Sequence, residues 1–392
     1  MAGDPIHIGV LATLLGPYRL LGEDGLRGAQ LAVAEFGGEV AGCPIYLYEE
    51  GTNAIPQHAT DMATKLLDRD GVDFIVGPLS GSEGIAIRDF AKTRPDRAFL
   101  NGSSGSQDLT LRQPAPNFFN FFSNGAQWMA GLGSYIYYNL GYRSVVTVAE
   151  DYPFPHSQVG AFMVEYCRVG GRVLDKHWVP LGTRDFSDII EHIPSDIDAI
   201  FVALGGTDAL HFIEQYDATG RRTPLVGGTI LVDQTILGVD DALADHLIGT
   251  CSAAPLADDN PEPEWQNFVA AYRSEFPDGP PYPSVTAYGF YMNMKAALLG
   301  LDAIRGDLSN GQQAFLAALT RLEFYSPTGP VRVDHNRQAI MNNFITMVER
   351  NEDGKLVNRL VAIIDGVNNS LGLSEDEYLA IGPFNRDNPS VC

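Results

Sequence analysis

Two short loops rich in serine and glycine carry the side chains best suited to hold an anionic ligand. Residues 77–83 read Gly-Pro-Leu-Ser-Gly-Ser-Glu, and residues 101–106 read Asn-Gly-Ser-Ser-Gly-Ser. Each loop precedes a helical or turn segment, and the free amides of a helix N-terminus attract anions. The loops therefore favour a cradle for a carboxylate or an amide. The plainer interpretation is helix capping, because Ser80 and Glu83 have capping-box spacing.

A third loop, residues 150–157, carries aromatic side chains instead. Tyr152 and Phe154 could stack on a planar ligand. They could equally anchor the helix that follows. His156 stands in the same loop, and its plainer interpretation is an isolated surface histidine.

Three further loops follow predicted strands. Residues 14–19 read Leu-Leu-Gly-Pro-Tyr-Arg, residues 205–208 read Gly-Gly-Thr-Asp and residues 227–229 read Gly-Gly-Thr. Ligands of open α/β sheets bind at the carboxyl ends of the strands, which makes these loops candidates. The last two are also compatible with ordinary tight turns.

Sequence signatures of catalysis are missing. The chain has neither G-x-G-x-x-G nor a phosphate-binding G-x-x-x-x-G-K-[ST] loop, and residues 102–105 have the wrong spacing for G-x-S-x-G. The eight histidines are scattered, without H-E-x-x-H. We therefore expect no catalytic residue, no metal and no cofactor.

Length and composition limit the class of protein. The 392 residues suit two domains, and 45% hydrophobic with 19% charged residues indicate a globular chain. No apolar run approaches the ~18 residues of a membrane span. A net charge of −23 argues against binding to nucleic acid.

The cysteines and the N-terminus leave the compartment open. Cys43, Cys167, Cys251 and Cys392 show no C-x-x-C spacing and allow three disulfide pairings, with free buried thiols equally open. The first residues lack the charged and apolar regions of an export signal. We expect either a cytoplasmic protein or an exported protein whose leader has been removed.

Alternating strands and helices must position these loops. In the first third, we predict strands at 6–12, 45–49, 72–77 and 97–101 and helices at 22–36, from Pro56, and at 82–93. The rhythm returns with strands at 144–150, 173–179, 198–204 and 224–228 and helices at 159–167, 185–192 and 207–217. The last part predicts helices at 262–276, 285–304 and 311–322 and strands at 331–333, 339–348 and 356–364. Two successive runs imply an α/β fold with two doubly wound sheets.

The order of motifs along nearly the whole chain resembles a known family. The motifs are Leu15-Gly16-Pro17, Gly77-Pro78-Leu79-Ser80, residues 101–110 (NGSSGSQDLT), Asp151-Tyr152-x-Phe154-x-His156-Ser157 and Ser326-x-x-Gly329-Pro330-Val331-Arg332. Together they resemble the type I periplasmic solute-binding proteins of the branched-chain amino-acid transporter class. The Tyr-x-Phe-x-His-Ser run is similar to the branch that binds aromatic acids.

The resemblance implies two Rossmann-like lobes joined by three hinge crossings, closing over a ligand. Lobe one would comprise residues 1–122 plus 253–328, and lobe two residues 123–252 plus 329–392. The resemblance also implies a periplasmic protein that delivers its ligand to an ABC permease in the membrane. We expect a monomer.

The same resemblance assigns ligand-binding positions. The ligand carboxylate would bind to the two serine-rich loops, and an aromatic side chain of lobe two would stack on the ligand. The implied residues are Tyr18, Leu21, Gly81, Ser82, Ser103, Ser104, Gly105, Tyr152, Phe154, His156, Thr207, Asp208 and Thr229.

Departures from the family pattern concern the ligand. Thr229 stands where amino-acid-specific relatives carry an acidic residue for the α-ammonium group, and Gly81 stands where a serine is expected. A buried ammonium without a counter-charge is costly. Unless Asp208 or Glu150 substitutes, we expect an organic acid, aromatic rather than an amino acid, with amino acids and amides as alternatives.

Two other functions use related architecture. A ligand sensor could share the fold, and an export leader or a neighbouring permease gene would distinguish a transport protein from it. A hydrolase on a doubly wound sheet would need a nucleophile paired with a base, which the sequence does not show. A turnover assay with esters and amides would test it.

Overall fold

The chain divides into two compact units. The computed structural model describes residues 3–238, 243 and 245–392. Unit 1 comprises Met1–Asn124 and Glu262–Met341, and unit 2 comprises Gly125–Pro261 and Asn342–Cys392. The chain therefore passes between the units three times, after residues 124, 261 and 341.

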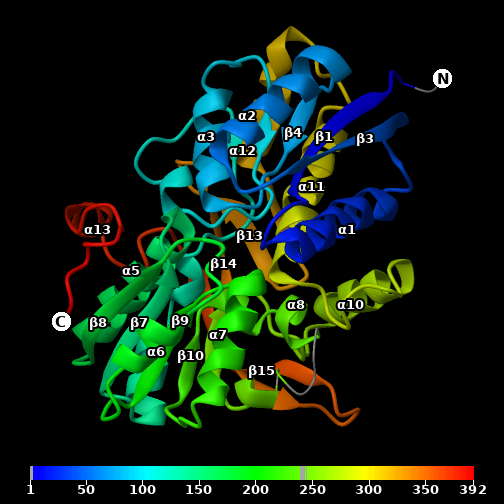
Figure 1. The fold of residues 1–392 in the computed structure, drawn as a ribbon. Helices are drawn as coiled ribbons and strands as arrows, with labels where there is room; N and C mark the ends of the chain where they lie inside the picture. The colour runs from blue at the N-terminus through cyan, green and yellow to red at the C-terminus, as the bar shows by residue number, and fades with distance from the viewer. Residues whose placement is uncertain (1–2, 239–242, 244) are drawn as a thin grey trace. The chain divides into compact units, whose positions relative to one another are not determined.

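Unit 1 is built on a six-stranded sheet in the order β2-β3-β1-β4-β5-β6, in which only β2 runs antiparallel to its neighbour. The strands are β1 (Ile6–Thr13), β2 (Glu39–Val40), β3 (Cys43–Thr52), β4 (Phe74–Val76), β5 (Phe99–Leu100) and β6 (Phe118–Phe119). The helices are α1 (Arg19–Glu35), α2 (Pro56–Lys65), α3 (Gly81–Ala91), α10 (Pro263–Glu275), α11 (Val285–Ala303) and α12 (Gln313–Arg321). Figure 1 shows α2 and α3 on one side of the sheet and α1 with α11 on the other.

Glycine sets the close packing of α1 in unit 1. A Cβ on Gly22 would lie 1.8 Å from the carbonyl oxygen of Thr13, and one on Gly28 would lie 1.9 Å from that of Ala287. Both contacts are with backbone, which cannot move aside easily. α1 can therefore lie directly against β1 and α11 only because these two positions lack a side chain.

Unit 2 has a parallel core of strands in the order β10-β9-β7-β8, with β11 beside β10. The elements are β7 (Ser144–Glu150), β8 (Arg172–Val179), β9 (Ala199–Ala203), β10 (Leu225–Gly227), β11 (Cys251–Ala254), α4 (Leu132–Tyr135), α5 (Pro153–Arg168), α6 (Ser187–His192), α7 (Gly206–Ala218) and α8 (Gln234–Leu237). β-branched residues of β7 and β9, such as Val146, Val148 and Ile200, are fully buried in its core.

A long strand belongs to both units. β14 (Ala339–Arg350) pairs at its start with β13 (Gly329–Val333), which also pairs with β12 (Glu323–Ser326). Residues 344–347 of β14 pair with β11, and β15 (Leu356–Val367) pairs with β14. Residues 253–261, expected in lobe one, therefore lie in unit 2 with β11. Residues 329–341, expected in lobe two, lie in unit 1 with β13.

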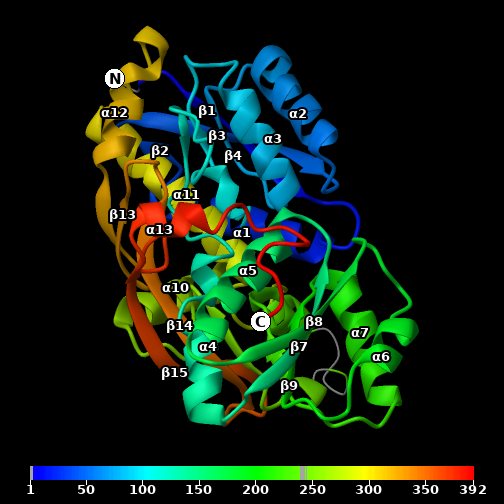
Figure 2. The same ribbon diagram turned by 90° about the vertical axis from the view of Figure 1, so that its left-hand side faces the viewer.

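The C-terminal segment is fastened to unit 2. After α13 (Glu375–Ala380) the chain runs beside α5 and β8 (Figure 2), and a disulfide joins Cys392 to Cys167 at the end of α5. Lys176 of β8 donates to the carbonyl oxygens of Arg386 and Pro389, at 2.8 and 2.7 Å. Cys43 and Cys251 are free and buried. The sequence had left the pairing open.

The predicted α/β fold is confirmed, and each predicted helix and strand has a counterpart. The elements that the sequence did not predict, such as β2, β6 and α4, are too short to show a periodic pattern. Among the described residues, no helix is both long and apolar enough to cross a membrane.

Candidate ligand-binding site

The loop between β4 and α3 leaves a buried serine hydroxyl without a partner. Ser80 is 2% exposed and precedes α3 with extended backbone, but its side chain does not cap the helix. Its Oγ has no hydrogen-bond partner among the described residues. Glu83, the expected partner in a capping box, accepts a hydrogen bond from Thr13 at 3.1 Å instead, and burial raises the pKa of its carboxyl. The capping interpretation of this pair is therefore wrong.

The loop after β5 repeats this feature. Ser103 is 5% exposed, its N–H donates to the carbonyl oxygen of Pro78 at 3.1 Å, and its Oγ has no partner among the described residues. Ser104 donates its hydroxyl to the carbonyl oxygen of Ser80 at 2.9 Å. The side chain of Asn101 holds the backbone of Ser104 at both its N–H and its carbonyl. The two serine-rich loops thus form one connected structure.

The neighbouring predicted residues complete this part of unit 1. Gly81 and Ser82 are the first two residues of α3, and Gly105 is buried in the loop that follows Ser104. Ser104 already uses its hydroxyl proton within the unit. We call Ser80, Gly81, Ser82, Ser103 and Gly105 the serine cradle.

The loop after β1 exposes different residues from those predicted. Tyr18 and Leu21 are buried in unit 1, whereas Leu15 in this loop and Leu20 in the first turn of α1 are exposed. The carbonyl oxygen of Tyr18 accepts the N–H of Gly22, in the first turn of α1.

Unit 2 places an aromatic cluster at the start of α5. Pro153 opens the helix, where its missing N–H costs nothing, and Tyr152 precedes it in extended conformation. The Phe154 ring lies 6.2 Å from that of Tyr152 and 5.5 Å from that of Trp128, which it meets edge-on. Sequence reasoning missed Trp128, because it lies on a segment with no regular pattern.

His156 is held by its neighbours in unit 2. Its Nε2 lies 2.8 Å from a carboxylate oxygen of Asp151, and its ring packs edge-on against Trp178. Burial lowers the pKa of His156, while the hydrogen bond to Asp151 opposes that shift. The other carboxylate oxygen of Asp151 lies 3.5 Å from Arg386 in the C-terminal segment. The surface-histidine interpretation is therefore wrong.

The polar residues after β9 and β10 have partners of their own. Thr229 accepts a hydrogen bond from Gln158 at 3.0 Å and donates to the carbonyl oxygen of Ala253 at 2.7 Å. Gln158, on α5, was not predicted from the sequence. The structure therefore joins the start of α5 to the loop after β10.

The acidic residues considered for an ammonium group are also engaged. Asp208 is 1% exposed and accepts the backbone N–H groups of Gly182 and Thr183, at 2.6 and 3.2 Å, while Thr207 beside it is exposed. Burial raises the pKa of the Asp208 carboxyl. Glu150 accepts the N–H of Gly205 at 3.1 Å. These carboxylates stabilise turns of unit 2.

The serine cradle of unit 1 and the aromatic cluster of unit 2 carry groups suited to binding a ligand. Unit 1 supplies buried neutral donors at the start of α3, and unit 2 supplies aromatic rings at the start of α5. Within the described part of the chain, no group of three or more His, Cys, Asp or Glu residues could hold a metal ion.

Comparison with known proteins decides the family. The model of the periplasmic binding protein family matches residues 5–355. A solved ABC transporter substrate-binding protein from Sphaerobacter thermophilus is 31% identical, with a TM-score of 0.84, over 93% of this chain and 99% of that chain. The chain belongs to the periplasmic binding protein family.

This periplasmic binding protein has similarities of two kinds. Leu/Ile/Val-binding protein homolog 6 of Brucella melitensis is 24% identical over 362 residues, which are 91% of this chain and 90% of the relative. A solute-binding protein of an ABC transporter from Rhodopseudomonas palustris BisB5, solved with 3,4-dihydroxybenzoic acid, is 24% identical. It shares the fold with a TM-score of 0.85 over 94% of this chain and 99% of that chain. The resemblance inferred from the motif order is confirmed.

Proposed function

We propose that this periplasmic binding protein captures a small aromatic carboxylate for an ABC uptake transporter. The serine cradle of unit 1 would bind the carboxylate, and Phe154 with its aromatic neighbours in unit 2 would contact the ring. Closure of the two units on the ligand, implied by the family, would then present the loaded form to a membrane permease.

The buried hydroxyls of Ser80 and Ser103 carry the proposal. A buried polar group without a partner costs about 1–3 kcal/mol, so native proteins rarely keep one without a reason. Two such hydroxyls lie in connected loops at the N-terminus of α3, where the amides favour an anion. Hydrogen bonds to a charged carboxylate are stronger than those to a neutral acceptor, so an anionic ligand would gain the most from the two hydroxyls.

The state of the acidic residues disfavours a free α-amino acid. Thr229 is neutral and already both donates and accepts a hydrogen bond. Asp208 is occupied by two backbone amides of its own unit. An α-ammonium group would therefore find no ready counter-charge at these positions, whereas an aromatic acid needs none.

We infer a periplasmic location, a monomeric state and the absence of catalysis. The Cys167–Cys392 disulfide supports export, because disulfides persist in oxidising compartments. The serine cradle supports binding, because neither the Ser80 nor the Ser103 hydroxyl is hydrogen-bonded to a base among the described residues.

A thermal-shift screen tests this function. A ligand that binds only the folded state raises the melting temperature. We expect 3,4-dihydroxybenzoate and 4-hydroxybenzoate to raise it, and leucine, isoleucine, valine and short amides to leave it unchanged. Stabilisation by amino acids without a response to aromatic acids would overturn the ligand class. No response from any of these compounds would leave both ligand classes without support.

A further inference from the structure

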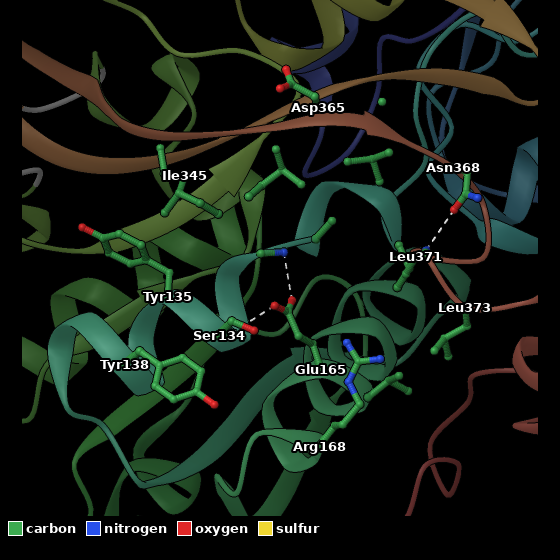
Figure 3. Close-up of a pocket in the computed structure, with 18 of the residues that line it drawn as sticks. Ser134, Tyr135, Tyr138, Glu165, Arg168, Ile345, Asp365, Asn368, Leu371 and Leu373 are labelled. Atoms are coloured by element: carbon green, nitrogen blue, oxygen red, sulfur yellow. Dashed lines mark hydrogen bonds between the residues drawn. The ribbon is translucent and has the colours of Figure 1, made fainter.

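A cavity lies within unit 2, lined by residues other than those of the candidate site described above. Its volume is about 560 Å³, within the usual range for small-molecule sites. Four segments line it: residues 130–139 around α4, the outer face of α5, strands β14 and β15, and the loop 368–373 (Figure 3). None of the residues of the serine cradle or of the aromatic cluster lines it.

The charges around this cavity are uneven. Glu165 lies in its wall, but its two oxygens accept the backbone N–H groups of Gly131 and Ser134, at 2.8 and 3.2 Å. Both of its oxygens are therefore already hydrogen-bonded within the unit. The guanidinium of Arg168, one turn further along α5, is exposed and forms no hydrogen bond or ion pair with any residue that the structure describes. In Figure 3 the Asp365 carboxylate lies at the opposite end of the cavity from Arg168 and is directed away from it.

The rest of the wall is largely apolar. Ile345 of β14 lies on one side, and Leu371 with Leu373 lie near Arg168 on the other (Figure 3). Ile364 of β15 also lines the cavity and lies beside Gly131, as Ile345 does. The ring of Tyr138, 67% exposed, stands at the rim. A largely apolar wall with an exposed, unpaired guanidinium at one end suits a molecule with an apolar body and a single anionic head.

We propose that this cavity binds an amphipathic monocarboxylate, such as a medium-chain fatty acid, at a site separate from the one for the transported solute. The carboxylate pairs with Arg168, because the planar guanidinium donates two parallel hydrogen bonds to a carboxylate. The chain lies on Ile345, Ile364, Leu371 and Leu373. A cationic amphiphile would meet the unpaired guanidinium and be repelled.

Calorimetric titration of the full chain with decanoate tests the site. Decanol and decyltrimethylammonium carry the same chain with no charge and with the opposite charge. We expect decanoate to bind with one-to-one stoichiometry, and about tenfold more tightly than decanol, because of the charged hydrogen bonds to Arg168. Equal affinities for the three amphiphiles, or no decanoate binding, would overturn the proposal.

Variants locate the binding. Arg168→Gln removes the charge, and Leu373→Asp places a carboxylate beside Arg168. Each should weaken decanoate binding about tenfold or more. Arg172→Gln is the matched control, because Arg172 is exposed on β8 and does not line the cavity. It should leave decanoate affinity unchanged, and an equal loss in this variant would overturn the proposal.

The transported-solute site needs its own control, because it too is proposed to bind carboxylates. Phe154→Ala should leave decanoate binding intact while it weakens binding of aromatic acids. Loss of decanoate binding in Phe154→Ala but not in Arg168→Gln would place decanoate at the first site and overturn this inference. Failure of the aromatic-acid screen would leave the result at Arg168 unaffected.

Discussion

The loops after the strands of the two units use their polar side chains differently. In unit 1 the buried hydroxyls of Ser80 and Ser103 have no hydrogen-bond partner among the described residues. In unit 2 the corresponding polar residues serve their own fold: Thr229 bonds to Gln158 and Ala253, and Asp208 to a turn. Predicted site residues of similar chemistry therefore have different roles.

We propose that this difference reflects different roles of the two units in ligand recognition. Unpartnered buried donors gain a full hydrogen bond when an acceptor arrives, whereas satisfied groups would have to give one up. We therefore assign the polar part of recognition to unit 1, and expect unit 2 to contribute mainly aromatic surface. The predictions below test that assignment in order of expected effect.

Ser103→Asp should have the largest effect, because it places a carboxylate where we propose that the ligand carboxylate binds. Like charges in a buried site repel strongly. We expect affinity for 4-hydroxybenzoate, measured by calorimetry, to fall about a hundredfold, or about 2.7 kcal/mol. Ser187→Asp adds the same charge at an exposed position of unit 2 and should change affinity less than about threefold. Equal losses would contradict the division between the units.

Asp258 is another buried carboxylate of unit 2 that is hydrogen-bonded within its own unit, as Asp208 is. It accepts hydrogen bonds from Gln234 and from the N–H of Asn358, both at 2.7 Å, and burial raises its pKa to about 7. The folded pKa lies above the unfolded value of 3.8, so Asp258 stays protonated in the folded protein at pH values where it ionises in the unfolded chain. Its contribution to the free energy of unfolding is therefore complete below pH 3.8 and is lost as the pH rises through about 7.

Chemical denaturation at several pH values measures this contribution. Raising the pH from 5 to 7 should reduce the unfolding free energy by about 2 kcal/mol more in the wild type than in Asp258→Asn. The difference between the two proteins cancels other titrating groups, such as His156. Parallel pH profiles would show that Asp258 titrates normally.

Phe154→Ala tests the aromatic contribution of unit 2. Loss of a buried ring contact should weaken binding of an aromatic acid by about 1–3 kcal/mol. Phe154→Leu keeps most of the apolar volume and should lose less. Unchanged affinity in both variants would remove Phe154 from the site.

Ser80→Ala and Ser103→Ala should have smaller effects, and they should lower ligand affinity without lowering the stability of the free protein. Each should weaken carboxylate binding by about 1–2 kcal/mol. Neither should lower the melting temperature of the free protein, because the hydroxyl that is removed has no partner. Ser104→Ala is the matched control: it removes a hydrogen bond to the Ser80 carbonyl oxygen and should lower that temperature. Destabilisation by all three variants would show that the hydroxyls serve the fold.

Much of the fold could be predicted because buried strands leave a local pattern. β7 has the bounds predicted for it, since seven consecutive buried residues form an unbroken run. α5 begins six residues before its predicted start, because the two prolines of its first turn resemble a loop. The strands of two residues carry too little sequence for any period.

The candidate site was predictable only where its residues lie on one loop. Ser103 and Phe154 follow strands directly, so their loops were visible in the sequence. The partners of Asp208 lie 26 and 25 residues away, and the disulfide joins residues separated by 225 positions. Trp128 and Gln158 reach Phe154 and Thr229 through packing that no local spacing encodes.

The preference for a carboxylate over an amide tests the role of the serine cradle most directly. Affinities for 4-hydroxybenzoate and 4-hydroxybenzamide should be measured by calorimetry on the wild type and on the Ser80→Ala/Ser103→Ala double variant. We expect the wild type to prefer the carboxylate by about tenfold or more, because hydrogen bonds to a charged acceptor are stronger. We expect the double variant to lose most of that preference. The same preference in both proteins would contradict the account.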